Sequence, residues 1–258
     1  MDTEDIAKAQ GHWILAKMGK KVLRPGGREL TEKLVKNLDI KSTDEVVEFA
    51  PGLGFTAEMT LKNNPKTYTG VDADKDAVAF LKSKIKCKQV QFIEGNASAT
   101  SIDSDSKDKV YGEAMLTMHA DHRKSEIIRE AHRILKKGGL YAIHELGLFP
   151  ANLPEELKAT IQKDLALSIK VNARPLTETE WSELLEKEGF KILNIEKNSM
   201  RLLETSRIIA DEGFFRTLKI GFNILKNKQA KKRVFEMRKT FNKHKNHMNA
   251  LVIVAEKL

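Results

Sequence analysis

The sequence predicts an α/β fold, with a mostly parallel seven-stranded sheet and helices on both of its faces. Two observations carry this prediction. From residue 30 to residue 147, short apolar runs alternate with segments of helical periodicity, as in successive strand–helix units. Two later apolar runs, at 189–196 and 251–255, are separated by a long helical stretch. We therefore expect an antiparallel terminal hairpin, with helical insertions after the fifth and the sixth strand.

Two helices are expected before the first strand. Residues 6–23 show loose helical periodicity, which stops at Arg24-Pro25-Gly26-Gly27. The second helix carries four apolar residues on one face: Leu30, Leu34, Val35 and Leu38. The apolar run Val46–Phe49 that follows predicts a buried first strand.

A glycine turn follows the first strand, with the sequence Ala50-Pro51-Gly52-Leu53-Gly54 before a helix that begins at Phe55. Gly52 and Gly54 carry no side chain that would keep a ligand off the backbone, and the N–H groups of the turn face such a ligand. The turn therefore indicates a nucleoside-bearing cofactor. Its spacing also satisfies a dinucleotide fingerprint, so the turn alone leaves the cofactor open.

The second and third strands end in polar residues. The second strand, Thr67–Val71, closes on Asp72, whose carboxylate can accept hydrogen bonds from both hydroxyls of a ribose. Asp72 could instead cap the next helix, although Asp74 is better placed for that. The third strand, Val90–Ile93, leads into Glu94-Gly95-Asn96-Ala97.

The fourth strand, Lys109–Leu116, ends at Thr117-Met118-His119, and a helix is expected from about Asp121. Lys136-Lys137-Gly138-Gly139 is expected to end this helix with a basic last turn and a glycine stop. The fifth strand is then Leu140–Leu146. Helical material follows, and Thr177 with Glu180 predicts a capping box.

From about residue 40 to about residue 147, these segments resemble the class I S-adenosylmethionine-dependent methyltransferases. The resemblance is carried by the acid and glycine turn at 48–54, by Asp72, by 94–97, and by a Leu-Lys-Lys-Gly-Gly segment before an apolar strand. That family usually reads acid-x-Gly-x-Gly-x-Gly at the first turn, whereas Ala50 here replaces the first Gly. The resemblance implies a Rossmann-like sheet and S-adenosyl-L-methionine as cofactor.

The resemblance also implies which residues contact the cofactor. In the family these positions lie at strand ends, and here they are Glu48, Ala50, Gly52, Gly54, Asp72, Ala73, Asn96, Ala97 and Met118. Glu48, Gly52 and Gly54 would hold the methionine end. Asp72 would bind the ribose, and Asn96 with Ala97 would bind the adenine.

Methyl transfer from a sulfonium requires positioned reactants, and a base where the nucleophile carries a proton. A base would lie at the carboxyl ends of strands four and five, where His119, His144 and Glu145 are the candidates. His144 and Glu145 alternate along a strand, so only one of them can face the pocket. No metal is expected, because no Cys or carboxylate cluster completes the pairs His119/His122 and His244/His247, whose i, i+3 spacing could ligate one.

Thr117-Met118-His119-Ala120 is not the Asn/Asp-Pro-Pro-Tyr motif that in the family marks transfer to planar amines. We therefore expect a small-molecule or lipid-like acceptor. We also expect a single domain over residues 1–258. It comprises an N-terminal helical lid at 1–40, a cofactor-binding core at 41–147, a helical insertion at 148–190 and the terminal hairpin with its basic insertion at 191–258.

The net charge of +9 is concentrated in residues 214–247, which contain eleven Lys or Arg residues and one acid. This segment can contact an anionic surface, although a solvated helical surface explains the charge equally well. Apolar and basic residues interleave in it, as in an amphipathic helix at a membrane surface. Nucleic acid is a weaker prediction, because the aromatic residues lie on a helical stripe rather than on strands.

The single Cys87, the acidic first residues and the absence of a long apolar run predict a cytoplasmic protein without a transmembrane segment. Two alternatives stay open. A nicotinamide-dependent oxidoreductase would have a second mononucleotide half where this chain has an insertion and a hairpin. A non-catalytic cofactor-binding or RNA-binding protein would account for the altered Ala50-Pro51 turn and the basic segment.

Overall fold

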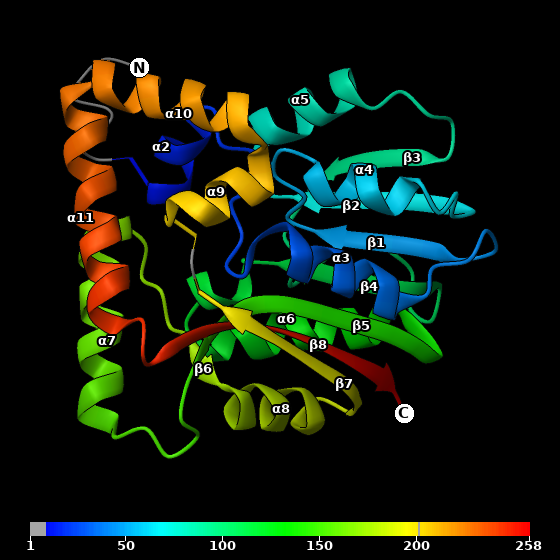
Figure 1. The fold of residues 1–258 in the computed structure, drawn as a ribbon. Helices are drawn as coiled ribbons and strands as arrows, with labels where there is room; N and C mark the ends of the chain where they lie inside the picture. Colours follow the sequence, from blue (N-terminus) through cyan, green and yellow to red (C-terminus); the bar gives the residue numbers. More distant parts are fainter. Residues whose placement is uncertain (1–8, 201) are drawn as a thin grey trace.

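The computed structural model describes residues 9–200 and 202–258 (Figure 1). One sheet has the strand order β3-β2-β1-β4-β5-β8-β7, and a short strand, β6, pairs with β5 outside this order. The strands are β1 (Glu45–Phe49), β2 (Thr67–Asp72), β3 (Val90–Glu94), β4 (Lys107–Glu113), β5 (Leu135–Leu148), β6 (Leu176–Thr177), β7 (Phe190–Ser199) and β8 (Met248–Lys257). The α/β prediction is confirmed, and β6 adds one strand to the seven expected.

The neighbouring strands from β3 to β5 are parallel, and β8 runs antiparallel to both β5 and β7. The predicted antiparallel terminal hairpin is therefore confirmed, with three helices inserted between its strands. Those helices are α9 (Thr205–Glu212), α10 (Phe214–Lys226) and α11 (Lys228–His244). Because β8 lies between β5 and β7, it is an interior strand, and its residues from Ala250 to Ala255 are almost fully buried.

Helices cover both faces of the sheet. One face packs against α3 (Gly27–Leu38), α4 (Phe55–Leu61) and α5 (Lys75–Lys84), and the other against α6 (Asp121–Ile134) and α8 (Glu178–Lys187). Side chains alternate between these faces, so Val46 packs with the first group and Val47 with the second. The predicted apolar face of the second helix is confirmed, since Leu30, Leu34, Val35 and Leu38 are buried in α3.

A third apolar cluster lies beyond the carboxyl ends of the parallel strands. It joins α2 (Gly11–Lys17), α7 (Glu155–Ile169), α10 and α11; in Figure 1, α7 and α11 stand at the left and α10 runs along the top. This cluster places helices from the first, middle and last parts of the chain over the edge of the sheet where the polar strand ends meet. None of the helices in the described part of the chain is long and apolar enough to cross a membrane.

Three predicted boundaries were wrong. Helical periodicity over 6–23 corresponds to α2 alone, ending at Lys17, and residues 6–8 lie outside the described part. The fourth strand ends at Glu113 instead of Leu116, because Ala114 takes a positive φ of 53° and Leu116–Met118 form a 3-10 turn. The Lys136–Gly139 segment does not end a helix. It opens β5, because Leu135 already pairs with Lys107 of β4.

Candidate functional site

A cavity of about 510 Å³ opens at the carboxyl ends of β1, β2, β3 and β4, and we call it the cleft. Eight of the residues predicted for the site line it: Ala50, Gly52, Asp72, Ala73, Asn96, Ala97, Met118 and His119. The other four, Glu48, Gly54, His144 and Glu145, lie outside its lining. The sheet thus gathers residues that are up to about seventy positions apart in the sequence, because parallel strands end at the same edge.

Gly52 and Gly54 have different structural roles in the glycine turn. A Cβ on Gly52 would meet no atom closer than the Ala50 carbonyl oxygen at 4.0 Å, so this position leaves open space at the cleft. A Cβ on Gly54 would lie 2.5 Å from Leu81 Cδ2, so Gly54 allows α5 to pack closely. Ala50, which stands where the family has a glycine, has a φ of 53°, a region that costs an alanine about 1–2 kcal/mol.

Asp72 joins the turn to the end of β2. Its Oδ2 accepts a hydrogen bond from the Gly52 amide at 3.0 Å, and its Oδ1 accepts one from the Asp74 amide at 2.9 Å. The helix-capping alternative for Asp72 is excluded, because Asp74 is the N-cap of α5 and accepts from the Asp76 and Ala77 amides. The Asp72 carboxylate is thereby fixed at the cleft by two backbone donors, each oxygen keeping a second lone pair.

Glu48 does not reach the cleft. Its side chain is buried on the α3 side of the sheet, where its Oε2 accepts hydrogen bonds from the Tyr68 and Tyr111 hydroxyls. Burial raises the pKa of Glu48 to about 7, although the two tyrosine hydroxyls act in the opposite direction. The structure therefore contradicts the predicted contact of this carboxylate with the methionine end of a cofactor.

Glu113 at the end of β4 lines the cleft and was missed by sequence reasoning. Its Oε2 lies 2.6 Å from Arg24 Nε, and its Oε1 lies 2.7 Å from His144 Nδ1. Burial acts to raise the pKa of Glu113, but Arg24 and His144 outweigh it and hold this pKa at about 2. In the sequence, the one indication that Glu113 belongs to the site is its place as an acidic residue at the end of an apolar strand.

His144 and Glu145, two of the predicted bases, are both fully buried. His144 Nε2 lies 2.6 Å from the Pro25 carbonyl oxygen, which can only accept, so this nitrogen donates. Its Nδ1 lies 2.7 Å from Glu113 Oε1, so both ring nitrogens are engaged within the protein. His144 is thus committed to holding the 24–25 turn on the sheet, and it lines neither cavity.

Glu145 lies on the opposite side from His144, as strand alternation requires. It accepts hydrogen bonds from three successive backbone amides, Met115 at 3.0 Å, Leu116 at 2.8 Å and Thr117 at 3.0 Å, and from the Thr117 hydroxyl at 2.7 Å. Burial raises its pKa, although these donors act against the rise. Its oxygens therefore fix the turn after β4, which carries Met118 into the cleft.

A second, apolar cavity of about 80 Å³ adjoins the cleft. The two share five lining residues: His12, Leu23, Ala114, Met118 and Val171. Glu145, one of the predicted bases, also lines the apolar cavity. The other lining residues are Gly11, Leu15, Pro25, Thr117, Leu146, Leu165, Ile169, Ala173, Met200, Leu202, Met237 and Phe241. The site therefore has a polar compartment and an apolar compartment that meet at His12 and Met118.

Two histidines, His119 and His12, line the cleft. Burial lowers the pKa of His119, and the nearby Arg123 and Lys124 lower it further. Burial also lowers the pKa of His12, which lines both cavities. Both imidazoles are therefore neutral at pH 7 and can accept a proton. His12 lies in α2, which the sequence identified only as part of a lid.

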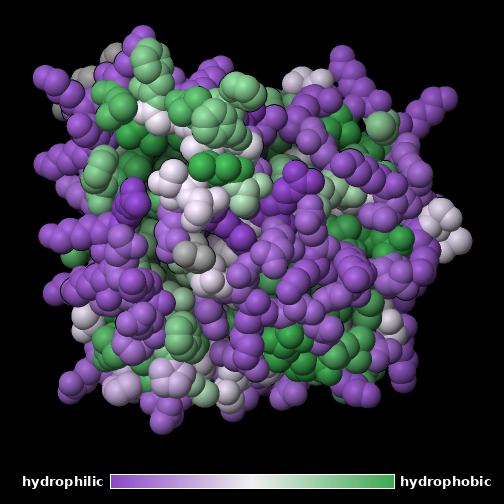
Figure 2. Space-filling model, viewed as in Figure 1, coloured by the Kyte–Doolittle hydropathy of each residue, from purple (hydrophilic) through white to green (hydrophobic). Residues whose placement is uncertain are grey.

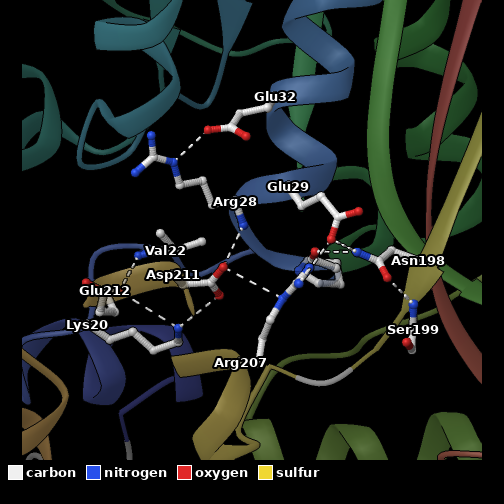
Figure 3. A network of polar contacts seen from close by, with 12 residues as sticks. Lys20, Val22, Arg28, Glu29, Glu32, Asn198, Ser199, Arg207, Asp211 and Glu212 are labelled. Atoms are coloured by element: carbon white, nitrogen blue, oxygen red, sulfur yellow. Dashed lines mark hydrogen bonds and ion pairs between the residues drawn. The ribbon is translucent and has the colours of Figure 1, made fainter. Parts of the chain in front are cut away.

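Residues 19–28, which we call the strap, form one wall of the cleft through Lys21, Leu23 and Arg24. The strap is held by the end of α9 (Figure 3). Glu212 Oε1 accepts from the Lys21 amide at 2.7 Å and from the Val22 amide at 2.8 Å. Asp211 Oδ1 accepts from the Arg28 amide at 2.9 Å.

Lys20 is buried between the same two acids, with its Nζ 3.8 Å from a carboxylate oxygen of each. Burial lowers the pKa of Lys20, and the two acids counteract this. A buried cation with two carboxylates keeps the strap in one position, because moving it would leave charges unpaired in the interior.

A family model described as a methyltransferase domain matches residues 47–143. An uncharacterized protein of Haemophilus influenzae is 32% identical over 253 residues, which are 96% of this chain and 98% of that protein. The match to the Haemophilus protein thus extends beyond the core to the strap and the inserted helices.

Two solved structures share the fold. Phosphoethanolamine N-methyltransferase 2 of Haemonchus contortus, in complex with phosphomonomethylethanolamine and S-adenosylhomocysteine, is 18% identical with a TM-score of 0.71. The alignment covers 96% of this chain and 57% of that one. A methyltransferase of Geobacter sulfurreducens, in complex with S-adenosyl-L-homocysteine, is 13% identical with a TM-score of 0.68 over 96% of this chain and 98% of that one.

Proposed function

The chain belongs to the class I S-adenosylmethionine-dependent methyltransferases, and we propose that its acceptor is a small-molecule or lipid-like compound whose apolar part enters the apolar cavity. One observation carries this proposal, namely the junction of the polar cleft with the apolar cavity at His12 and Met118. Bound S-adenosylmethionine supplies a methyl group on a sulfonium, an activated leaving group. The protein's own task is to hold the two reactants in line and to exclude water.

The cleft residues fit this cofactor. Asp72 offers a fixed carboxylate to the ribose hydroxyls, and Ala73 lies beside it in the lining. We assign Asn96 and Ala97 to the adenine, and the Ala50–Gly52 backbone to the methionine end, where the missing Cβ of Gly52 leaves room.

Arg24 takes the place of Glu48 in our assignment of the methionine end. It lines the cleft and brings a positive charge, which suits the carboxylate of the methionine moiety. Its Nε is already paired with Glu113 at 2.6 Å, so the guanidinium is oriented before any ligand binds. Glu48 and Gly54 contribute to the packing behind the cleft.

A base is needed only if the accepting atom carries a proton. Of the predicted candidates, His119 lines the cleft, whereas the bonding atoms of His144 and Glu145 are engaged in the protein. We propose His12 as the proton acceptor, because it lines both the cleft and the apolar cavity. His119 lines the cleft alone. In this assignment His144 and Glu145 are positioning residues.

The first test is calorimetric titration with S-adenosylhomocysteine, with NAD and NADP in parallel. We expect binding of S-adenosylhomocysteine alone, and binding of the nicotinamide cofactors alone would overturn the assignment of the cleft. The second test is a methyl-transfer screen with apolar acceptors and, as a comparison, with bulk RNA. Turnover of RNA without turnover of any apolar compound would refute the proposed acceptor class.

A further inference from the structure

Helix α10 presents an exposed apolar face. Five large side chains on it have exposed fractions of 57–85%: Phe214, Phe215, Leu218, Phe222 and Leu225. At 3.6 residues per turn these positions fall within an arc of about 100°. Figure 2 shows the hydrophobic residues gathered over this helix, beside the strongly hydrophilic surface of α11. Such a concentration on one helix marks an interaction site more often than chance exposure.

The position of α10 is fixed from its opposite face. Ile220 is 2% exposed, Arg216 Nε donates to the Gly19 carbonyl at 3.0 Å, and Asn223 Nδ2 donates to the Met18 carbonyl at 2.9 Å. These contacts attach the helix to the α2 end of the strap. The apolar face therefore cannot turn inward without breaking them.

Cations surround the apolar face. Lys219 and Lys226 lie on α10, and the exposed side of α11 adds Lys228, Lys231, Lys232, Arg238 and Lys239. Among the residues that the structure describes, none of these seven forms an ion pair with an acid. Lys226 Nζ instead lies 4.5 Å from the centroid of the Phe222 ring. Phe235, on the same side of α11, is 56% exposed.

We propose that α10 and the exposed side of α11 form a docking surface for an anionic lipid bilayer. A bilayer surface provides negative headgroups for the cations and, a few ångströms deeper, an apolar region for phenylalanine and leucine side chains. Nucleic acid would match the charge but would leave the leucines without a partner. The combination of unpaired cations and a deep apolar stripe favours the lipid surface.

The docking surface includes α11, whose buried residues Met237 and Phe241 line the apolar cavity. Ile220 of α10 packs in the same cluster as Leu15, Met237 and Phe241, which line that cavity. Docking would therefore bring the helical wall of the acceptor compartment to the bilayer. Docking itself does not depend on the proposed acceptor, because it requires only the surface of α10 and α11.

The test is flotation of the purified full chain with phosphatidylcholine vesicles, with and without phosphatidylglycerol. We expect binding to the anionic vesicles that weakens with salt. The double variant Phe215→Gln/Phe222→Gln should weaken it about tenfold or more, because each side chain loses its apolar burial. Phe80→Gln, which removes an exposed phenylalanine of α5, is the matched control and should leave binding unchanged.

A second pair of variants tests the charge. Lys219→Gln/Lys226→Gln should weaken binding about fivefold for each lysine removed. Lys36→Gln/Lys62→Gln, on exposed positions elsewhere, should have no effect. Every variant should bind S-adenosylhomocysteine like the unmodified protein, which shows that it is folded and separates this test from that of the proposed function.

Three outcomes would overturn the docking proposal. One is the absence of binding to anionic vesicles. Another is vesicle binding that neither Phe215→Gln/Phe222→Gln nor Lys219→Gln/Lys226→Gln changes. The third is a concentration-dependent dimer in light scattering that Phe215→Gln/Phe222→Gln abolishes while vesicle binding persists, because the apolar face would then belong to a second copy of the chain.

Discussion

Glu48 and Glu113 lie on the neighbouring parallel strands β1 and β4, and both are buried, with exposed fractions of 1% and 6%. Their pKa values nevertheless move in opposite directions, to about 7 and about 2. Glu48 receives hydrogen bonds from two neutral tyrosine hydroxyls, whereas Glu113 is paired with the Arg24 guanidinium and also contacts His144 Nδ1. The difference shows that the charge of the partners, and not burial, decides which carboxylate stays ionised.

The regions around Glu113 and Glu48 also have different roles in the molecule. The Glu113 region faces the cleft and ties the strap to the sheet, through Arg24 and through the Pro25 carbonyl. The Glu48 region lies behind the glycine turn and fills the core between the sheet and the helices α3 and α4. Ionised groups are thus kept where a charged ligand would bind, and the interior holds a carboxyl group that is easily neutralised.

The largest expected effect comes from removing the negative charge of Glu113 beside the cleft. Glu113→Gln leaves the buried Arg24 guanidinium without its anion, which should lower the free energy of unfolding by about 3–5 kcal/mol. Urea denaturation at pH 7 measures this loss. Glu48→Gln should not be destabilising under the same conditions. Equal losses for both variants would show that the two regions do not differ as described.

A pH series on Glu48→Gln sharpens the comparison. The pKa of Glu48 is raised in the folded state, so its contribution to stability is complete below about pH 4.5 and is lost as the pH rises through about 7. The free energy of unfolding of the unmodified protein, relative to that of the Gln variant, should therefore fall by about 3 kcal/mol across this window. A flat difference from pH 4 to pH 8 would contradict the raised pKa.

The contribution of Glu113 to the free energy of unfolding should change with pH in the opposite direction, and at lower pH. Its pKa is lowered in the folded state, so its contribution is present above about pH 4.5 and is lost as the pH falls toward 2. Relative to Glu113→Gln, the unmodified protein should therefore lose its advantage on acidification, in urea titrations between pH 5 and pH 3. A constant advantage over this range would show that Glu113 is not paired with cations in the folded state.

A third carboxylate tests the cleft itself. Asp72→Asn removes one of the two charged oxygens proposed for the ribose and should weaken S-adenosylhomocysteine binding about thirtyfold, or by about 2 kcal/mol. Calorimetry measures this affinity. Asp74→Asn is the control, since asparagine caps a helix as well as aspartate and should leave the affinity unchanged. Equal affinities for both variants would remove Asp72 from the ribose contact.

The smallest expected effect concerns the turn between the two regions. Gly52→Ala should lower stability by about 1 kcal/mol, because its φ of 56° is unfavourable for alanine, and should also weaken cofactor binding. In contrast, Gly221→Ala should raise stability by up to about 1 kcal/mol, because a Cβ added at this helical glycine would meet no atom within 4 Å. Thermal unfolding with and without S-adenosylhomocysteine distinguishes the two effects.

The sequence predicted the strands and the lining of the cleft well because that information is local. Asp72 directly follows an apolar run and Asn96 stands three residues after the next one, and parallel strands bring such ends together. Glu48 was assigned wrongly because the motif names the residue but not its side of the sheet. Alternation places Glu48 with Val46, on the side of α3, and away from the cleft.

The pairing of Arg24 with Glu113 could not be predicted because the two residues are distant in the sequence. Glu113 meets an arginine about ninety residues earlier, and the strap is held by Glu212 at a separation of 190 residues or more. The apolar cavity likewise combines seven segments, none of which carries a local signal for a cavity. Hydrophobic periodicity gives the buried face of a helix but not the helix that packs against it.

The interior position of β8 determines the order in which the molecule can be completed. Residues 248–257 are synthesised after all the other strands, yet they separate β5 from β7 and contact both along nearly their whole length. Until they emerge, β5 is an unpaired edge rich in apolar residues, of the kind that promotes aggregation. The α9 acids that bind the strap also come late, so a nascent chain that ends at residue 147 can hold this wall of the site only through Glu113 and His144.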